Sequence, residues 1–135
     1  MIEVAMVFDK KGNAIFWPSV PGSAGSIPDN RNLWDRLWEN RDILGGVAHT
    51  HPWDGPTSPS GTDLTTFAAI EAGLGKALIW PIVTMTHVSF WAKRGARMAI
   101  REEDNGSYVE VWQPFLHKEW EKNIEELRRL SLNRG

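Results

Sequence analysis

Apolar residues predict a hairpin and a helix in the first third of the chain. Residues 2–8 and 14–17 are largely apolar and flank a polar turn at residues 9–13, which predicts a β-hairpin. A Pro/Gly/Ser-rich loop follows, and Asp29 is a suitable N-cap for a helix that runs to about Arg41. The helix has one apolar stripe, spaced i, i+1, i+4 and i+5: Leu33, Trp34, Leu37 and Trp38.

The middle of the chain predicts a strand, a loop and a second helix. Residues 43–51 (ILGGVAHTH) read as a strand that ends before Pro52, and residues 52–61 form a loop rich in proline and glycine. A helix is expected from about Thr62 to Ala72, ended by Gly73 or Gly75. Its apolar side consists of Leu64, Phe67, Ile70 and Leu74.

The last third of the chain predicts three strands and a terminal helix. Residues 77–91 are β-branched and aromatic and read as one long strand, in which Pro81 indicates a sheet edge or a bulge. Shorter strands are expected at 98–101 and 108–112, on either side of a turn at 104–106. A helix over about 114–132 carries a Glu125–Arg129 pair and a buried stripe of Leu116, Trp120, Ile124 and Leu127.

This order, β-β-α-β-α-β-β-β-α, predicts an α/β fold of the mixed α+β kind, with a single mixed β-sheet flanked by helices. The 135 residues fit one domain, 1–135, and 41% hydrophobic residues with eight tryptophans indicate a real core. The net charge of −2 gives no support for nucleic-acid binding. No apolar run spans a membrane and no signal peptide is evident, so a cytoplasmic location is expected.

Two histidines at the end of the 43–51 strand carry the clearest chemical signal. His49 and His51 are two positions apart, so their imidazoles point to the same face, while Thr50 points to the other. Asp63 lies in the first turn of the next helix. Two imidazoles and one carboxylate, with a position left for water, are typical of a catalytic zinc site. The chain has no cysteine, which excludes thiolate ligands and a cysteine nucleophile.

Each part of this pattern also has a simpler explanation. A His-x-His pair on a strand is often just two surface histidines. Ser60-x-x-Asp63 before an apolar helix is a capping box, which alone explains Asp63. The combination, at the end of an apolar strand, favours the metal site.

The motifs His49-Thr50-His51-Pro52 and Ser60-x-x-Asp63 together resemble the signature of the JAMM/MPN (Mov34/JAB) zinc metalloproteases. That signature is an upstream Glu, then His-Ser/Thr-His-Pro, then Ser-x-x-Asp. The resemblance covers roughly residues 1–112 and implies the family's cytidine-deaminase-like architecture, in a small stand-alone form like bacterial or phage members. The gap between His51 and Asp63 is one residue longer than in the commonest form, and the Pro/Gly loop absorbs the extra residue at little cost.

The resemblance implies a role for each residue that matches the signature. His49, His51 and Asp63 would bind one Zn²⁺ per chain, with water in the fourth position. Glu3 matches the family glutamate, which acts as general base and passes the proton to the leaving amine. Ser60 matches the serine that stabilises the oxyanion of the tetrahedral intermediate.

Four other polar residues are weighed against these assignments. Asp54, on the loop, and Glu71, two helical turns beyond Asp63, are the alternative bases, although Glu71 is expected to face away from the ion. His87 is expected to be a satisfied histidine on the long strand, and His117 a solvated one near the last helix.

The resemblance implies a hydrolase that cleaves an amide or isopeptide bond. Its expected partner is a protein or peptide substrate, namely the extended C-terminal tail of a ubiquitin-like protein, with no nucleic acid and no membrane. Two alternatives stay open. One is a phage-tail type of peptidase acting on cell-wall peptide through the same metal centre. The other is a non-catalytic MPN scaffold, against which the retained ligands argue.

Overall fold

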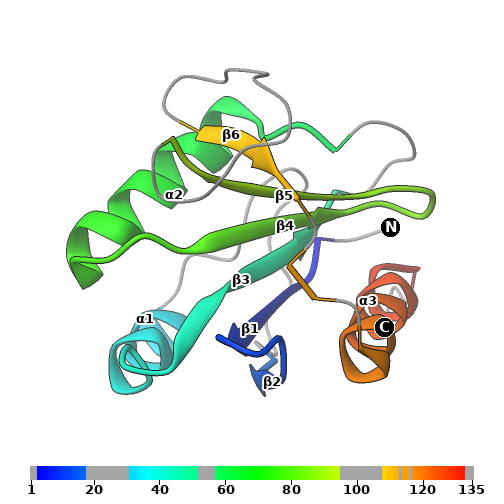
Figure 1. The fold of residues 1–135 in the computed structure, drawn as a ribbon, viewed down its shortest axis with the longest axis horizontal. Helices are drawn as coiled ribbons and strands as arrows, with labels where there is room; N and C mark the ends of the chain where they lie inside the picture. The colour runs from blue at the N-terminus through cyan, green and yellow to red at the C-terminus, as the bar shows by residue number, and fades with distance from the viewer. Residues whose placement is uncertain are drawn as a thin grey trace.

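The computed structural model describes residues 3–17, 31–51, 57–94, 108–112, 114–115 and 117–132. Six strands in these residues form one sheet in the order β2-β1-β3-β4-β5-β6, in which only the β3–β4 neighbours run parallel (Figure 1). The elements are β1 (Ala5–Asp9), β2 (Ala14–Phe16), α1 (Arg31–Glu39), β3 (Leu44–Thr50), α2 (Gly61–Leu74), β4 (Ile79–Val83), β5 (Val88–Lys93), β6 (Tyr108–Val111) and α3 (Lys118–Leu132).

Both faces of the sheet are covered, which gives the mixed α+β class that the sequence predicts. Alternate residues of β1 enter two different clusters, Met6 with residues of α3 on one face and Val7 with residues of α1 and α2 on the other. The α3 side contributes the stripe residues Trp120, Ile124 and Leu127, all buried. His49 lies on the face covered by α2, where its ring contacts Phe67.

The hairpin and the first helix agree with the sequence prediction. In the turn, the Asp9 carboxylate accepts hydrogen bonds from the N–H groups of Lys11 (2.9 Å) and Asn13 (3.0 Å). Helix α1 buries Leu33 and Leu37. The expected cap, Asp29, lies outside the described residues, as do the expected strand at 98–101, the turn at 104–106 and the stripe residue Leu116.

The prediction of one long strand over residues 77–91 is wrong, because the chain turns at residues 84–87 between β4 and β5. The Thr84 hydroxyl accepts from the His87 N–H at 3.1 Å, and the Thr84 N–H donates to the His87 carbonyl at 2.9 Å. A threonine side chain therefore closes a turn that lacks glycine. His87 is correspondingly an exposed turn residue and not a strand residue, with Nδ1 2.7 Å from the Thr86 hydroxyl.

Pro81 lies in the middle of the sheet and not at its edge, because β4 is flanked by β3 and β5. The β3–β4 pairing passes from Gly46↔Ile79 to His49↔Ile82, with a gap at Trp80 and Pro81. The sheet thus accommodates the missing N–H of proline by a local gap in the parallel ladder.

Helix α2 ends at Gly75, whose positive φ of 71° suits glycine and whose N–H bonds to the Glu71 carbonyl. Of the two glycines that the sequence offered as helix stops, Gly75 therefore serves. On α3, the expected Glu125–Arg129 pair is replaced by i,i+3 pairs: Arg129 bonds to Glu126 (2.6 Å) and Arg128 to Glu125 (2.8 Å). Within the described residues, no helix has the length and apolar character needed to cross a membrane.

Candidate metal centre

Strand β3 and the residue that follows it present two histidines on the α2 face of the sheet. Ala5 pairs with His49 across the antiparallel β1–β3 ladder, so both side chains share that face. His51 follows two positions later, at the end of the strand, where its N–H bonds to the Val83 carbonyl at 3.0 Å. His49 and His51 are both fully buried, at 0% and 1% exposure.

Helix α2 carries the third residue, Asp63, in its first turn. The Ser60 hydroxyl accepts from the Asp63 N–H at 3.0 Å, and the Asp63 carboxylate oxygen Oδ2 accepts from the Ser60 N–H at 2.9 Å. The capping box predicted from the sequence is thus present. It fixes the Asp63 side chain so that the carboxylate points toward the two histidines.

The three side chains converge at separations that suit a metal ion. His49 Nε2 lies 3.2 Å from His51 Nε2 and 3.3 Å from Asp63 Oδ1, while His51 Nε2 lies 2.9 Å from Asp63 Oδ2. A tetrahedral zinc ion with bonds of about 2.05 Å holds its ligand atoms about 3.3 Å apart. The donor set and its spacing therefore fit zinc, and within the described residues no fourth side-chain ligand joins the three.

The buried polar atoms also favour a cation at this point. Asp63 Oδ1 is fully buried, and no residue in the described part of the chain donates it a hydrogen bond of normal geometry. Two imidazole nitrogens that face each other at 3.2 Å share at most one proton between them, whereas a cation attracts both lone pairs. Without such a cation, the burial of these groups is costly.

The protonation states that metal binding requires are favoured by the surroundings. Burial lowers the pKa of His49 below its ordinary value of 6.5, against the opposing effect of Asp63. Burial alone would raise the pKa of Asp63, but the His49 and His51 rings and the Ser60 N–H hold it well below its usual 3.8. A neutral imidazole and an ionised carboxylate are the forms that bind metal.

Glu3 lies next to this group, on the strand segment that leads into β1. The Val4 N–H donates to the Thr50 hydroxyl at 2.8 Å, and the Thr50 N–H donates to the Val4 carbonyl at 2.9 Å. Extending this register by one pair places Glu3 opposite His51, on the same face as the ligands. Glu3 is fully buried and is not one of the three residues whose ligand atoms lie close together.

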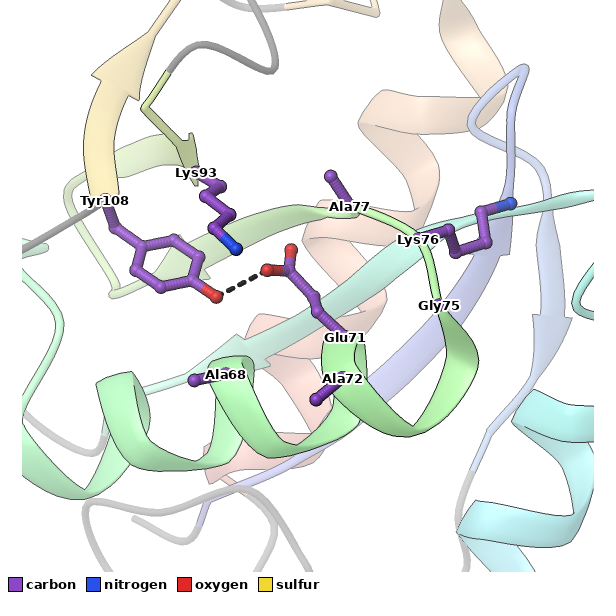
Figure 2. Close-up of a pocket in the computed structure, with 8 residues that line it drawn as sticks. All are labelled: Ala68, Glu71, Ala72, Gly75, Lys76, Ala77, Lys93 and Tyr108. Carbon is purple, nitrogen blue, oxygen red and sulfur yellow. Dashed lines mark hydrogen bonds between the residues drawn. The ribbon is translucent and has the colours of Figure 1, made fainter.

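The alternative base Glu71 belongs to a different part of the molecule. Its carboxylate accepts from the Leu78 N–H (2.8 Å), the Trp80 indole N–H (2.9 Å) and the Tyr108 hydroxyl (2.5 Å). Glu71 and Tyr108 line a cavity of about 320 Å³. Figure 2 shows the two side chains meeting there, with Lys93 pointing toward them. This cavity lies at the opposite end of α2 from Asp63, so Glu71 is a structural anchor. Asp54, the other alternative, lies outside the described residues.

The sequence did not predict the hydrogen bonds that fasten the segments carrying the candidate site residues to the rest of the fold. It placed Thr50 correctly on the opposite face but not its bond to Val4, which fastens the Glu3 segment to β3. It also missed Ser89 and Trp91 of β5, which both donate to the Thr57 carbonyl. The only feature of the sequence that points to the contact with Thr57 is Ser89, a polar residue within an otherwise apolar strand. His117, expected to be solvated, is exposed, yet Nε2 lies 2.6 Å from the Lys11 carbonyl.

Comparison of the sequence with known protein families and with curated proteins gives no match in either case.

Proposed function

We propose that the chain is a zinc-dependent hydrolase that cleaves an amide or isopeptide bond. The observation that carries the proposal is the convergence of His49, His51 and Asp63 in a buried cluster, with separations of 2.9–3.3 Å between facing atoms. Three protein ligands and an open position are typical of catalytic rather than structural zinc. The placement of Glu3 on the same face of the sheet as His49 and His51 supports the interpretation as a JAMM-type site.

His49, His51 and Asp63 would hold the zinc ion, which would supply the Lewis acidity that makes water a nucleophile near neutral pH. The chain's own residues do the rest. Glu3 accepts the proton of the attacking water and delivers it to the leaving amine. The Ser60 hydroxyl oxygen accepts the Asp63 N–H in the cap, and the proposal assigns to the same hydroxyl the role of donor to a developing oxyanion. Asp63 remains ionised and balances the positive charge.

The proposed substrate is a protein or peptide with an extended tail, such as the C-terminus of a ubiquitin-like protein joined to an amine. This part of the proposal rests on the resemblance of the two motifs. The proposal includes action in the cytoplasm and no nucleic-acid or membrane partner, in line with the net charge of −2.

The deciding experiment is elemental analysis of protein purified without added zinc, followed by a cleavage screen on ubiquitin-like fusion proteins. We expect about one zinc per chain. Absence of zinc that dialysis against zinc does not restore would reject the metal centre. Zinc without cleavage of any fusion would reject the proposed substrate class.

A pair of variants separates catalysis from metal binding. Glu3→Gln keeps the shape of the side chain but removes the proton acceptor, so turnover should fall by ~10²–10⁴ while zinc stays bound. Glu119→Gln makes the same change on the exposed face of α3 and should leave turnover unchanged. Near-normal turnover in Glu3→Gln would assign the base elsewhere.

A further inference from the structure

The loop that joins the candidate ligands His51 and Asp63 is fastened to β5 at Thr57, before the helix begins. The Thr57 carbonyl accepts from the Ser89 hydroxyl at 2.7 Å and from the Trp91 indole N–H at 2.9 Å. The indole N–H also lies 2.8 Å from the Ser89 oxygen, so the three groups form a closed triangle. All three residues are buried. We call this arrangement the Thr57 clamp.

Ser89 of the Thr57 clamp and the candidate ligand His49 lie on one line across the sheet, perpendicular to the strands. His49 pairs with Ile82 across the β3–β4 ladder, and Ile82 pairs with Ser89 across the β4–β5 ladder. Residues directly opposite one another share a face, so Ser89 and His49 both point toward α2. The clamp thus ties the loop to the rigid sheet that carries the histidines, about 10 Å away across two strand spacings.

Few backbone torsion angles are free to vary between the Thr57 clamp and Asp63, the candidate ligand that follows it. Pro59 is buried and its ring fixes one backbone angle. Ser60 adopts the extended conformation of an N-cap, and the capping box holds Asp63 to it. The position of the clamp therefore determines where the first turn of α2 starts, and with it the position of the Asp63 carboxylate.

We propose that Ser89 and Trp91 are positioning residues that hold Asp63 at metal-binding distance from His49 and His51. This inference rests on the proposed zinc centre. A ligand atom displaced by a fraction of an ångström weakens binding, and loss of a partner outside the ligand shell typically costs 10–100-fold in metal affinity.

The test is the zinc dissociation constant, measured by competition with a chromophoric chelator. Ser89→Ala removes one of the two donors and should raise this constant about tenfold. Trp91→Phe removes the other donor and should raise it in the same direction. Ser89→Thr keeps the hydroxyl and should restore affinity to within about twofold of the wild type.

Tyr108→Phe is the matched control for a general loss of stability. It removes a buried hydroxyl hydrogen bond at the opposite end of α2 and should leave zinc affinity unchanged. Equal affinity in Ser89→Ala and the wild type would overturn the clamp while leaving the zinc centre standing, and so would an equal loss in Tyr108→Phe. A wild-type chain that binds no zinc would overturn both proposals.

Discussion

Tyr108 is the only tyrosine in the chain, so its ionisation can be followed without interference from another phenol. Its hydroxyl donates to the Glu71 carboxylate (Figure 2). The same carboxylate also accepts from the Leu78 N–H and the Trp80 indole N–H. Burial raises the pKa of Tyr108 above its ordinary value of 10, and the hydrogen bond to Glu71 and the charge of that carboxylate raise it further. Deprotonation would replace a hydrogen bond by two facing anions.

The sign of the pH dependence follows from this shift. The stabilisation from neutral Tyr108 is fully present below pH ~10, where both folded and unfolded chains keep the proton. As the pH rises further, the unfolded chain releases the proton first. The free energy of unfolding then falls by about 1.36 kcal/mol per pH unit until the pH passes the folded pKa. Tyr108→Phe should lack this contribution to alkaline destabilisation.

At pH 7 the same substitution removes one hydrogen bond to a charged acceptor. We expect a loss of about 1.5–3 kcal/mol in the free energy of unfolding, because Glu71 keeps its other two donors. Urea unfolding should show a lower midpoint with an unchanged slope. Tyrosinate absorbance provides the direct test. If the folded protein ionises Tyr108 near pH 10, as an unfolded chain does, the argument about Glu71 is refuted.

The remaining predictions concern the metal centre. Ser60→Ala should cost about 1 kcal/mol as a lost cap and Ser60→Gly only tenths. Both should lower kcat by roughly 10²-fold if the hydroxyl supports the oxyanion; unchanged kcat in both would leave Ser60 as a cap alone. Thr50→Val leaves the buried Val4 N–H without its acceptor and should cost about 1–3 kcal/mol in urea unfolding, with Thr50→Ser restoring stability. Zinc at 100 times its dissociation constant should stabilise the wild type by about 2.7 kcal/mol, whereas Asp63→Asn should show a much smaller rise in Tm in the same melts because its amide is uncharged. A zinc-dependent rise of wild-type size in Asp63→Asn would contradict its role as ligand.

Local patterns in the sequence were sufficient for most of the fold. The period of the apolar residues placed α1, α2 and β3, and the polar turn at residues 9–13 placed the first hairpin. The same reasoning failed at residues 84–87, where threonines have high strand propensity yet here close a turn through the Thr84 hydroxyl. Of the two alternatives for Pro81, a sheet edge or a bulge, the edge is wrong. The cost of a missing N–H depends on the partner that this N–H would have bonded, and that partner is set by the tertiary structure.

In the candidate site, too, some features could be predicted from the local sequence and others could not. The two histidines and Asp63 follow from spacing, because alternation on a strand and the first turn of a helix are local geometry. Their partners come from distant segments: Val4 lies 46 residues from Thr50, and Ser89 lies 32 residues from Thr57. Such contacts depend on strand order and register, which local periodicity does not encode. The convergence of the three candidate ligands was therefore easier to predict than the contacts that hold their segments in place.

Helix capping and metal binding are alternative explanations of Asp63 in the sequence, but the structure allows both at once. Its Oδ2 atom accepts the Ser60 N–H at 2.9 Å, which completes the cap, while Oδ1 lies 3.3 Å from His49 Nε2. A carboxylate has two oxygens with lone pairs to spare, so capping leaves it able to bind a cation. The cap also restricts the rotamer of Asp63 before any metal arrives, which lowers the entropic cost of binding. The capping box is thus part of what makes Asp63 a suitable ligand, and its presence in the sequence is no argument against the metal site.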